Sequence, residues 1–230
     1  GANARYRAAQ VGGCLEAVVE RRADGATLLR STEPLQPYAE RLTDRLEHWA
    51  RVAPERIFAA RRGADGAWRE IRYAGMLARA RAVGQALASR PLSAERPLAI
   101  LSDNDLEHLT LYLAAMWVGV PVVPVSPAYS LISQDYGKLR HVMATTTPGL
   151  VFASDARYAN AIAATVGADV EVVLAKGALP DRATTPFAAL LDTAPGAQVD
   201  AAHARVGPDT IVKFLFTSGS TKAPKAVVNT

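Results

Sequence analysis

A short segment near residue 220 concentrates side chains that bind phosphate. Between Thr217 and Lys225 the sequence places four hydroxyl groups, one glycine and two lysines, directly after the apolar stretch that ends at Phe216. Hydroxyl and backbone N–H groups donate to phosphate oxygens, and lysine supplies a positive point charge. Gly219 lets the backbone approach a ligand closely or adopt a positive φ. We therefore interpret this segment as a candidate phosphate-binding loop.

The spacing in this segment differs from that of a Walker loop, in which glycine is followed after four residues by Gly-Lys-Ser/Thr. Counted from Gly219, the fifth and seventh residues are Pro224 and Ala226, so the magnesium-binding hydroxyl of a Walker loop is missing. Pro224 also disfavours the helix that should follow such a loop. Val227 and Val228 predict a second strand instead. The segment is thus predicted to be a strand–loop–strand unit, which disfavours a nucleotidyl hydrolase with its own Walker loop.

A surface turn rich in serine and threonine is the ordinary structural interpretation of such a cluster. The full string from Phe216 to Val227, Phe-Thr-Ser-Gly-Ser-Thr-Lys-Ala-Pro-Lys-Ala-Val, is more specific. It resembles the phosphate loop of the adenylate-forming superfamily of acyl-CoA synthetases, luciferases and nonribosomal peptide adenylation domains, although Lys222 and Ala226 stand where most members have glycine. By this resemblance Lys225 is the catalytic residue. The residues expected to bind the nucleotide phosphates are Thr217, Ser218, Gly219, Ser220, Thr221, Lys222 and Lys225.

The resemblance extends over nearly the whole chain. Residues 68–74, 98–104 and 114–121 resemble the family's early strand-to-helix junction and first crossover unit. Residues 123–130 and 138–141 are similar to the feruloyl-CoA synthase branch, which shares the departures at the two glycine positions of the loop. This similarity implies ferulate or a related hydroxycinnamate as the acid, with a medium- or long-chain fatty acid as the alternative.

The resemblance implies an AMP-forming acid–thiol ligase that uses ATP, Mg²⁺ and coenzyme A. A carboxylate would attack the α-phosphorus of ATP, and the thiol of coenzyme A would then displace AMP. Family members are more than twice this length, so we expect this chain to be an incomplete N-terminal part. We expect residues 1–230 alone to be inactive and to bind ATP weakly. A non-catalytic binding domain with the same fold is the rival interpretation.

The elements that must position the loop follow an alternating pattern. Apolar runs at 98–101, 122–125, 150–153 and 170–174 predict buried strands, and helical patterns at 106–117, 134–144 and 156–166 separate them. This alternation predicts an α/β fold with a parallel-rich sheet flanked by helices. Before it, the sequence predicts a hairpin around Ala23-Asp24-Gly25, a helix over 41–52, a second hairpin over 57–73 and a helix over 74–89.

The domain organisation is predicted from changes in composition. We expect an N-terminal extension with the first helix over 1–50, a first α/β subdomain over 51–208, and the start of a second subdomain over 209–230. The stretch 176–208 contains four prolines and predicts a long connection in which only 187–191 is ordered. We expect the strand that begins near Thr210 to leave the first sheet and to start another.

Composition and charge limit the classes of protein. The chain of 230 residues is 50% hydrophobic and 21% charged, which excludes a disordered chain. Its net charge of +4 is scattered, so we predict no nucleic-acid partner. The apolar stretch 109–125 is interrupted by Gly119 and two prolines, so no membrane span is expected. Cys14 is the only cysteine and the four histidines lack metal-ligand spacing, which predicts a reducing, cytoplasmic location and no metal ligands.

Overall fold

The computed structural model describes residues 16–217 and 223–230. The chain forms two compact units, Gly1–Ala39 and Glu40–Thr230. In the first unit, β1 (Ala17–Arg21) and β2 (Thr27–Ser31) pair antiparallel around a turn in which Gly25 has a φ of 87°. Arg30 Nη2 lies 2.8 Å from Glu20 Oε2 across the two strands. The hairpin predicted around Gly25 is therefore confirmed.

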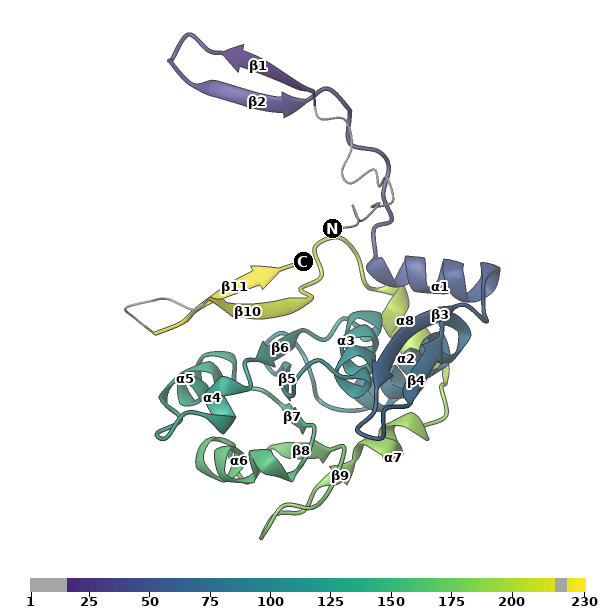
Figure 1. Cartoon of the computed structure of the whole chain (residues 1–230), viewed down its shortest axis with the longest axis vertical. Coiled ribbons are helices and arrows are strands. Elements are labelled where there is room, and N and C mark those ends of the chain that lie inside the picture. The colour runs from purple at the N-terminus through teal and green to yellow at the C-terminus, as the bar shows by residue number, and fades with distance from the viewer. Residues whose placement is uncertain (1–15, 218–222) are drawn as a thin grey trace, which may run out of the picture. The chain divides into compact units, whose positions relative to one another are not determined.

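The second unit is built on a seven-stranded sheet with the order β11-β10-β6-β5-β7-β8-β9 (Figure 1). The strands from β10 to β9 are parallel to their neighbours, and β11 is antiparallel to β10. This topology confirms the predicted α/β fold. The strand bounds are β5 (Leu98–Leu101), β6 (Val122–Val125), β7 (Leu150–Ala153), β8 (Glu171–Leu174), β9 (Thr185–Pro186), β10 (Lys213–Thr217) and β11 (Lys225–Asn229).

Two layers of helices enclose the central strands, as Figure 1 shows. In β5, Leu98 and Ile100 pack in the cluster that includes α2 (Tyr73–Ala88), α3 (Leu106–Val118) and α7 (Phe187–Leu191). Ala99 and Leu101 pack in the opposite cluster, with α5 (Gly137–Thr146) and α6 (Ala159–Thr165). Because both faces are buried, the central strands are continuous apolar runs rather than alternating ones. In the part of the chain that the structure describes, no helix is long and apolar enough to cross a membrane.

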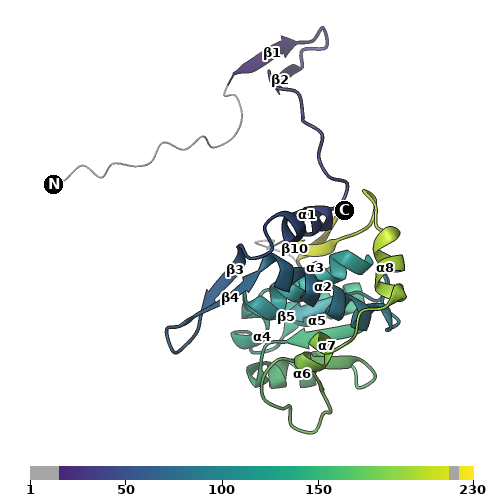
Figure 2. The same ribbon diagram turned by 90° about the vertical axis from the view of Figure 1, so that its right-hand side faces the viewer.

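A third apolar cluster attaches the first elements of this unit to the helices. Leu46 of α1 (Leu42–Val52), Ile71 of β4 (Trp68–Arg72) and Met76 of α2 pack there against Leu113 of α3. β4 pairs antiparallel with β3 (Ile57–Arg62), and this predicted hairpin extends from the body of the unit in Figure 2. The helix and hairpin predicted over 41–73 are confirmed, and they join the same core as the sheet.

The helix that follows β5 begins and ends on the residues that the sequence indicates. Asp105 Oδ1 accepts a hydrogen bond from His108 N at 2.7 Å, which satisfies a free N–H group of the first turn of α3. Gly119 ends α3 in the left-handed conformation, with a φ of 74°, which a residue with a side chain rarely adopts. These two ends fix the length of the crossover that joins β5 to β6.

The stretch 176–208 is more ordered than its composition predicts, and the prediction of a long irregular connection is wrong there. It contains β9, α7 and α8 (Ala197–Ala204), and α8 packs against α2 and α3. Gly84 allows the close approach of α2 and α8, because a Cβ there would lie 3.1 Å from Val199 Cγ2. Arg81 Nη2 binds Asp200 Oδ1 at 2.8 Å across the same contact.

The strand after Thr210 also differs from its prediction, because β10 joins the existing sheet. Lys213 pairs with Val122 of β6, and Val122 N donates to Val212 O at 3.0 Å. This attachment occurs at the base of β10, and the hairpin of β10 and β11 continues outward from it (Figure 1). The apolar face of β10 completes the cluster beside β6, so burial favours pairing here over a separate sheet. The proposed subdomain boundary at 208/209 stays a prediction.

His203 of α8 sits at the junction of three helices and gives a prediction about pH. Its ring stacks on Trp117 at 3.8 Å between centroids, and its Nε2 lies 2.9 Å from Thr43 Oγ1. Burial lowers the pKa of His203, and the nearby charge of Arg41 lowers it further, against smaller opposite effects of Glu47, Asp44 and Asp200. The neutral ring is therefore the form that the fold favours.

We expect the free energy of unfolding to fall as the pH drops below about 6.5, because the unfolded chain then binds a proton that the folded chain resists. His203→Gln should flatten this dependence in urea unfolding measured from neutral to mildly acidic pH. An unchanged slope in His203→Gln would contradict the assignment.

Candidate functional site

The predicted phosphate loop joins two paired strands. Thr217, the last residue of β10, is the register partner of Lys225, the first residue of β11. Thr217 Oγ1 also donates to Lys225 O at 3.4 Å. This pairing confirms the two strands predicted on either side of the segment. Of the predicted site residues, Thr217 and Lys225 are brought together, whereas Ser218, Gly219, Ser220, Thr221 and Lys222 lie outside the described residues.

We call Thr217, Pro224 and Lys225 the neck of the hairpin. Phe216, next to the neck, packs against the apolar cluster beneath β6, and so does Phe214. His141 of α5 places its ring edge-on to Phe216, with centroids 6.1 Å apart and planes at 86°. Its Nε2 lies 2.8 Å from Pro224 O. One side chain of α5 therefore contacts Phe216 of β10 and the residue that directly precedes β11, which are 75 and 83 residues away in sequence.

The direction of β10 decides where the loop emerges. Because β10 is parallel to β6, the neck lies at the edge of the sheet where the parallel strands end. In open α/β sheets, ligands bind at this edge, near the point where crossovers leave to opposite faces. Here β5 leads to α3 on one face, whereas β6 and β7 lead to α5 and α6 on the other. The neck is thus at the edge of the sheet that suits a ligand.

Polar side chains from the neighbouring strands line the same edge. Ser102, directly after β5, donates through Oγ to Asp105 Oδ2 at 2.8 Å. After β7, Arg157 Nε lies 2.9 Å from Asp155 Oδ1, and this hydrogen bond holds the pKa of Asp155 at about 2, against the opposing effect of burial. Burial raises the pKa of Tyr158. At neutral pH this edge therefore carries an ionised carboxylate that is already paired.

Sequence reasoning missed His141 and the Asp155–Arg157 pair. The signal for the pair is local, because Asp155 caps the short helix η1 (Ala156–Tyr158) through Arg157 N at 2.9 Å. For His141 no local pattern is available, because its partners on the hairpin are distant in sequence. Among the described residues, no group of three or more His, Cys, Asp or Glu side chains could hold a metal ion.

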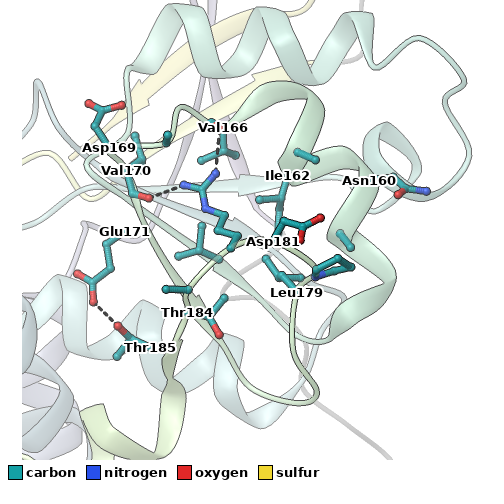
Figure 3. A pocket seen from close by; sticks show the side chains of 17 residues that line it. Asn160, Ile162, Val166, Asp169, Val170, Glu171, Leu179, Asp181, Thr184 and Thr185 are labelled. Carbon is teal, nitrogen blue, oxygen red and sulfur yellow. Dashed lines mark hydrogen bonds between the residues drawn. The ribbon is translucent and has the colours of Figure 1, made fainter.

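A cavity of about 890 Å³ lies away from the neck, between α6, β8 and the turn 179–185 (Figure 3). Its lining includes the apolar residues Ile162, Val166 and Leu179 and the charged residue Arg182. The guanidinium group donates to the carbonyl oxygens of Val166, Gly167 and Val170. The carboxylate of Glu171 accepts hydrogen bonds from Arg90 and Thr185. The hydrogen bond from Arg90 is the main reason why the pKa of Glu171 is lowered. Arg182 therefore holds the turn before β8, and Glu171 links β8 to Thr185 of β9 and to Arg90.

The fold and the matched region together define the class of the protein. The sequence matches the family of AMP-binding enzymes over residues 46–230, so the chain belongs to this family. The matched region contains the whole seven-stranded sheet and the neck of the hairpin. No curated protein sequence matches the chain.

Several solved structures share the fold. A putative long-chain-fatty-acid CoA ligase from Rhodopseudomonas palustris CGA009 aligns with a TM-score of 0.62 and 20% identity, over 82% of this chain and 44% of that one. ATP-bound MatB from Rhodopseudomonas palustris aligns with a TM-score of 0.54 and 26% identity, over 80% and 34%. A fatty acyl-adenylate ligase from L. pneumophila, in complex with acyl adenylate and pyrophosphate, gives 0.58 and 16%, over 83% and 30%. The chain thus spans less than half the length of each of these proteins.

The role of Arg182 in the cavity can be tested by stability. We expect Arg182→Met to lower the free energy of unfolding by about 1–3 kcal/mol, because three carbonyl groups lose a charged donor. Arg45→Met, which replaces an exposed arginine of α1, is the control and should change it by less than about 0.5 kcal/mol. Urea unfolding of the three proteins measures both values. Equal stability of the two variants would show that solvent replaces the guanidinium group.

Proposed function

We propose that the protein is an ATP-dependent acyl-CoA synthetase, which joins a carboxylic acid to coenzyme A through an acyl-adenylate. The observation that carries this proposal is the string Phe216–Val227. Its two ends lie on paired strands whose neck is at the edge where the parallel strands end, within the region that matches the AMP-binding enzymes. The seven predicted residues Thr217 to Lys222 and Lys225 then surround the nucleotide phosphates.

In the first half-reaction, a carboxylate oxygen forms a bond to the α-phosphorus of ATP, and the bond to pyrophosphate breaks. The physical difficulty is charge, because an anion approaches a polyanion and further negative charge builds on the leaving group. A lysine and hydroxyl donors at the β- and γ-phosphates reduce both costs. Lys225 supplies the charge, and the hydroxyl of Thr217 lies beside it at the neck.

In the second half-reaction, the thiol of coenzyme A attacks the acyl carbon, a thioester forms and AMP leaves. The family resemblance implies Mg²⁺ with the nucleotide. Among the described residues, no cluster of His, Cys, Asp or Glu side chains could hold that ion. The contribution of this chain is therefore the charge and the hydrogen-bond donors near the phosphates.

The proposed substrate is ferulate or a related hydroxycinnamate, on the similarity of residues 123–130 and 138–141 to the feruloyl-CoA synthase branch. In the structure, these residues form β6, α4 (Ala128–Leu131) and the first turn of α5, beside the neck. The fatty acid ligases among the solved structures are at most 20% identical and carry no argument about the acid. A medium- or long-chain fatty acid is the alternative outcome of the substrate test.

The test of the catalytic role uses Lys225→Ala in the complete protein. We expect the rate of carboxylate-dependent ATP–pyrophosphate exchange to fall by about 100-fold, whereas the KM for the carboxylate changes little, because the lysine acts on the departing pyrophosphate. Lys213→Ala removes a lysine from the other end of β10 and is the matched control. An exchange rate equal to that of the control would remove Lys225 from the catalytic set.

The test of substrate class measures thioester formation separately with ferulate and with fatty acids of different lengths. We expect kcat/KM to be at least about 100-fold higher for ferulate, because a slot shaped for a flat ring leaves a flexible chain poorly packed. A preference for a fatty acid would refute the hydroxycinnamate assignment and keep the synthetase proposal. No thioester and no exchange with any acid would favour a non-catalytic binding domain.

A further inference from the structure

His141 makes a long-range contact with the hairpin of the proposed site. Its Nε2 lies 2.8 Å from Pro224 O, across 83 residues of sequence. A carbonyl oxygen only accepts hydrogen bonds, so Nε2 carries the hydrogen and donates it. The same ring makes a T-shaped contact with Phe216 of β10. One side chain therefore contacts β10 at Phe216 and the residue that directly precedes β11, next to Thr217 and Lys225.

The accepting carbonyl is well placed to orient Lys225. Pro224 O belongs to the peptide group that contains Lys225 N, and this group is planar. A hydrogen bond that fixes the direction of the carbonyl therefore also fixes the peptide plane that contains N and Cα of Lys225. The proline ring restricts φ of its own residue, and Pro224 is buried. On the other side, Thr217 Oγ1 donates to Lys225 O at 3.4 Å.

The donor is held by a helix that is itself fixed to the core. Leu139, Val142 and Met143 of α5 are buried in the cluster beneath the sheet. Arg140 donates to Ala164 O, which ties α5 to the end of α6. Lys138 Nζ lies 5.4 Å from the ring centroid of Tyr129 in α4. His141 thus extends from a rigid base toward a hairpin that pairs with the sheet only near Lys213.

We propose that His141 is a positioning residue of the adenylation site: its hydrogen bond to the Pro224 carbonyl holds the start of β11 so that Lys225 is directed at the nucleotide phosphates. This role rests on the proposed function. His141 needs no contact with substrate, because it acts through the peptide group that precedes the lysine. The ring contact with Phe216 adds packing, and the hydrogen bond supplies the orientation.

Two variants separate the hydrogen bond from the packing. His141→Gln keeps an N–H donor at the same number of bonds from Cα but removes the ring. His141→Phe keeps a ring against Phe216 but removes the donor. We expect kcat/KM for ATP in pyrophosphate exchange to fall about 10-fold in His141→Phe and less than about threefold in His141→Gln, with KM for the carboxylate unchanged in both. Equal losses in the two variants would overturn the role of the hydrogen bond.

A double-mutant cycle with Lys225→Ala tests whether His141 acts through the lysine. In the Lys225→Ala background, His141→Phe should cause no further loss of exchange rate, because the group that it positions is gone. Independent, multiplied losses would overturn the proposal. Hydrogen exchange of the β11 amides gives a readout apart from the reaction, and it should be faster in His141→Phe than in the unaltered protein or in His141→Gln.

The outcomes distinguish this role from the proposed function. If the unaltered protein shows no carboxylate-dependent exchange with any acid, the synthetase proposal fails and the catalytic role of His141 fails with it. If the unaltered protein is active but His141→Phe matches it in kcat/KM for ATP, the positioning role alone is overturned. Faster amide exchange in β11 without any change in kcat/KM for ATP would likewise reduce His141 to a structural contact.

Discussion

Both faces of the central parallel strands are buried, so each strand must find its backbone hydrogen bonds within the plane of the sheet. With Leu98–Leu101 at 0% exposure, the backbone N–H and C=O groups of β5 can be satisfied only by neighbouring strands in the plane of the sheet. Parallel pairing meets this demand, and it requires crossover helices that cover both faces. The crossovers carry the chain back after each strand, so the strands end together at one edge. The position of the candidate site follows from that requirement.

The hairpin of β10 and β11 is only partly buried and only partly paired with the sheet. Its base is paired with β6 at Lys213, whereas Leu215 and Val227 remain 42% exposed farther along. Backbone pairing therefore does not hold the neck against the sheet. Phe214, Phe216 and His141 supply this attachment through side chains. The geometry of Lys225 is thus set by tertiary contacts that differ in kind from those that hold the central strands.

The sequence predicted the central strands and helices well because burial leaves a direct trace in composition. Short apolar runs bounded by turn residues have few alternatives to a buried strand. α8 was missed because prolines and a glycine surround it, and because its alanines and Gln198 form no apolar stripe with a helical period. Its packing depends on the absence of a side chain at Gly84, and this role becomes visible only once α2 and α8 are known to be in contact. The neighbour of β10 was also missed, because apolar periodicity indicates a strand but not its partner.

The candidate site likewise has one part that a local segment predicts and another part that depends on residues distant in sequence. The phosphate loop could be predicted because its hydroxyls, glycine and lysines stand in one continuous segment, and its phosphate-binding role stays a prediction. The structure shows that Thr217 and Lys225, on either side of that segment, pair across the hairpin. The support of that segment comes from α5, which contributes a histidine that is ordinary in its own sequence context. A continuous loop can supply the chemistry of phosphate binding, but the fixed direction of a catalytic charge requires a rigid neighbour. In this fold α5, which lies in the crossover from β6 to β7, contacts the neck of the hairpin through His141.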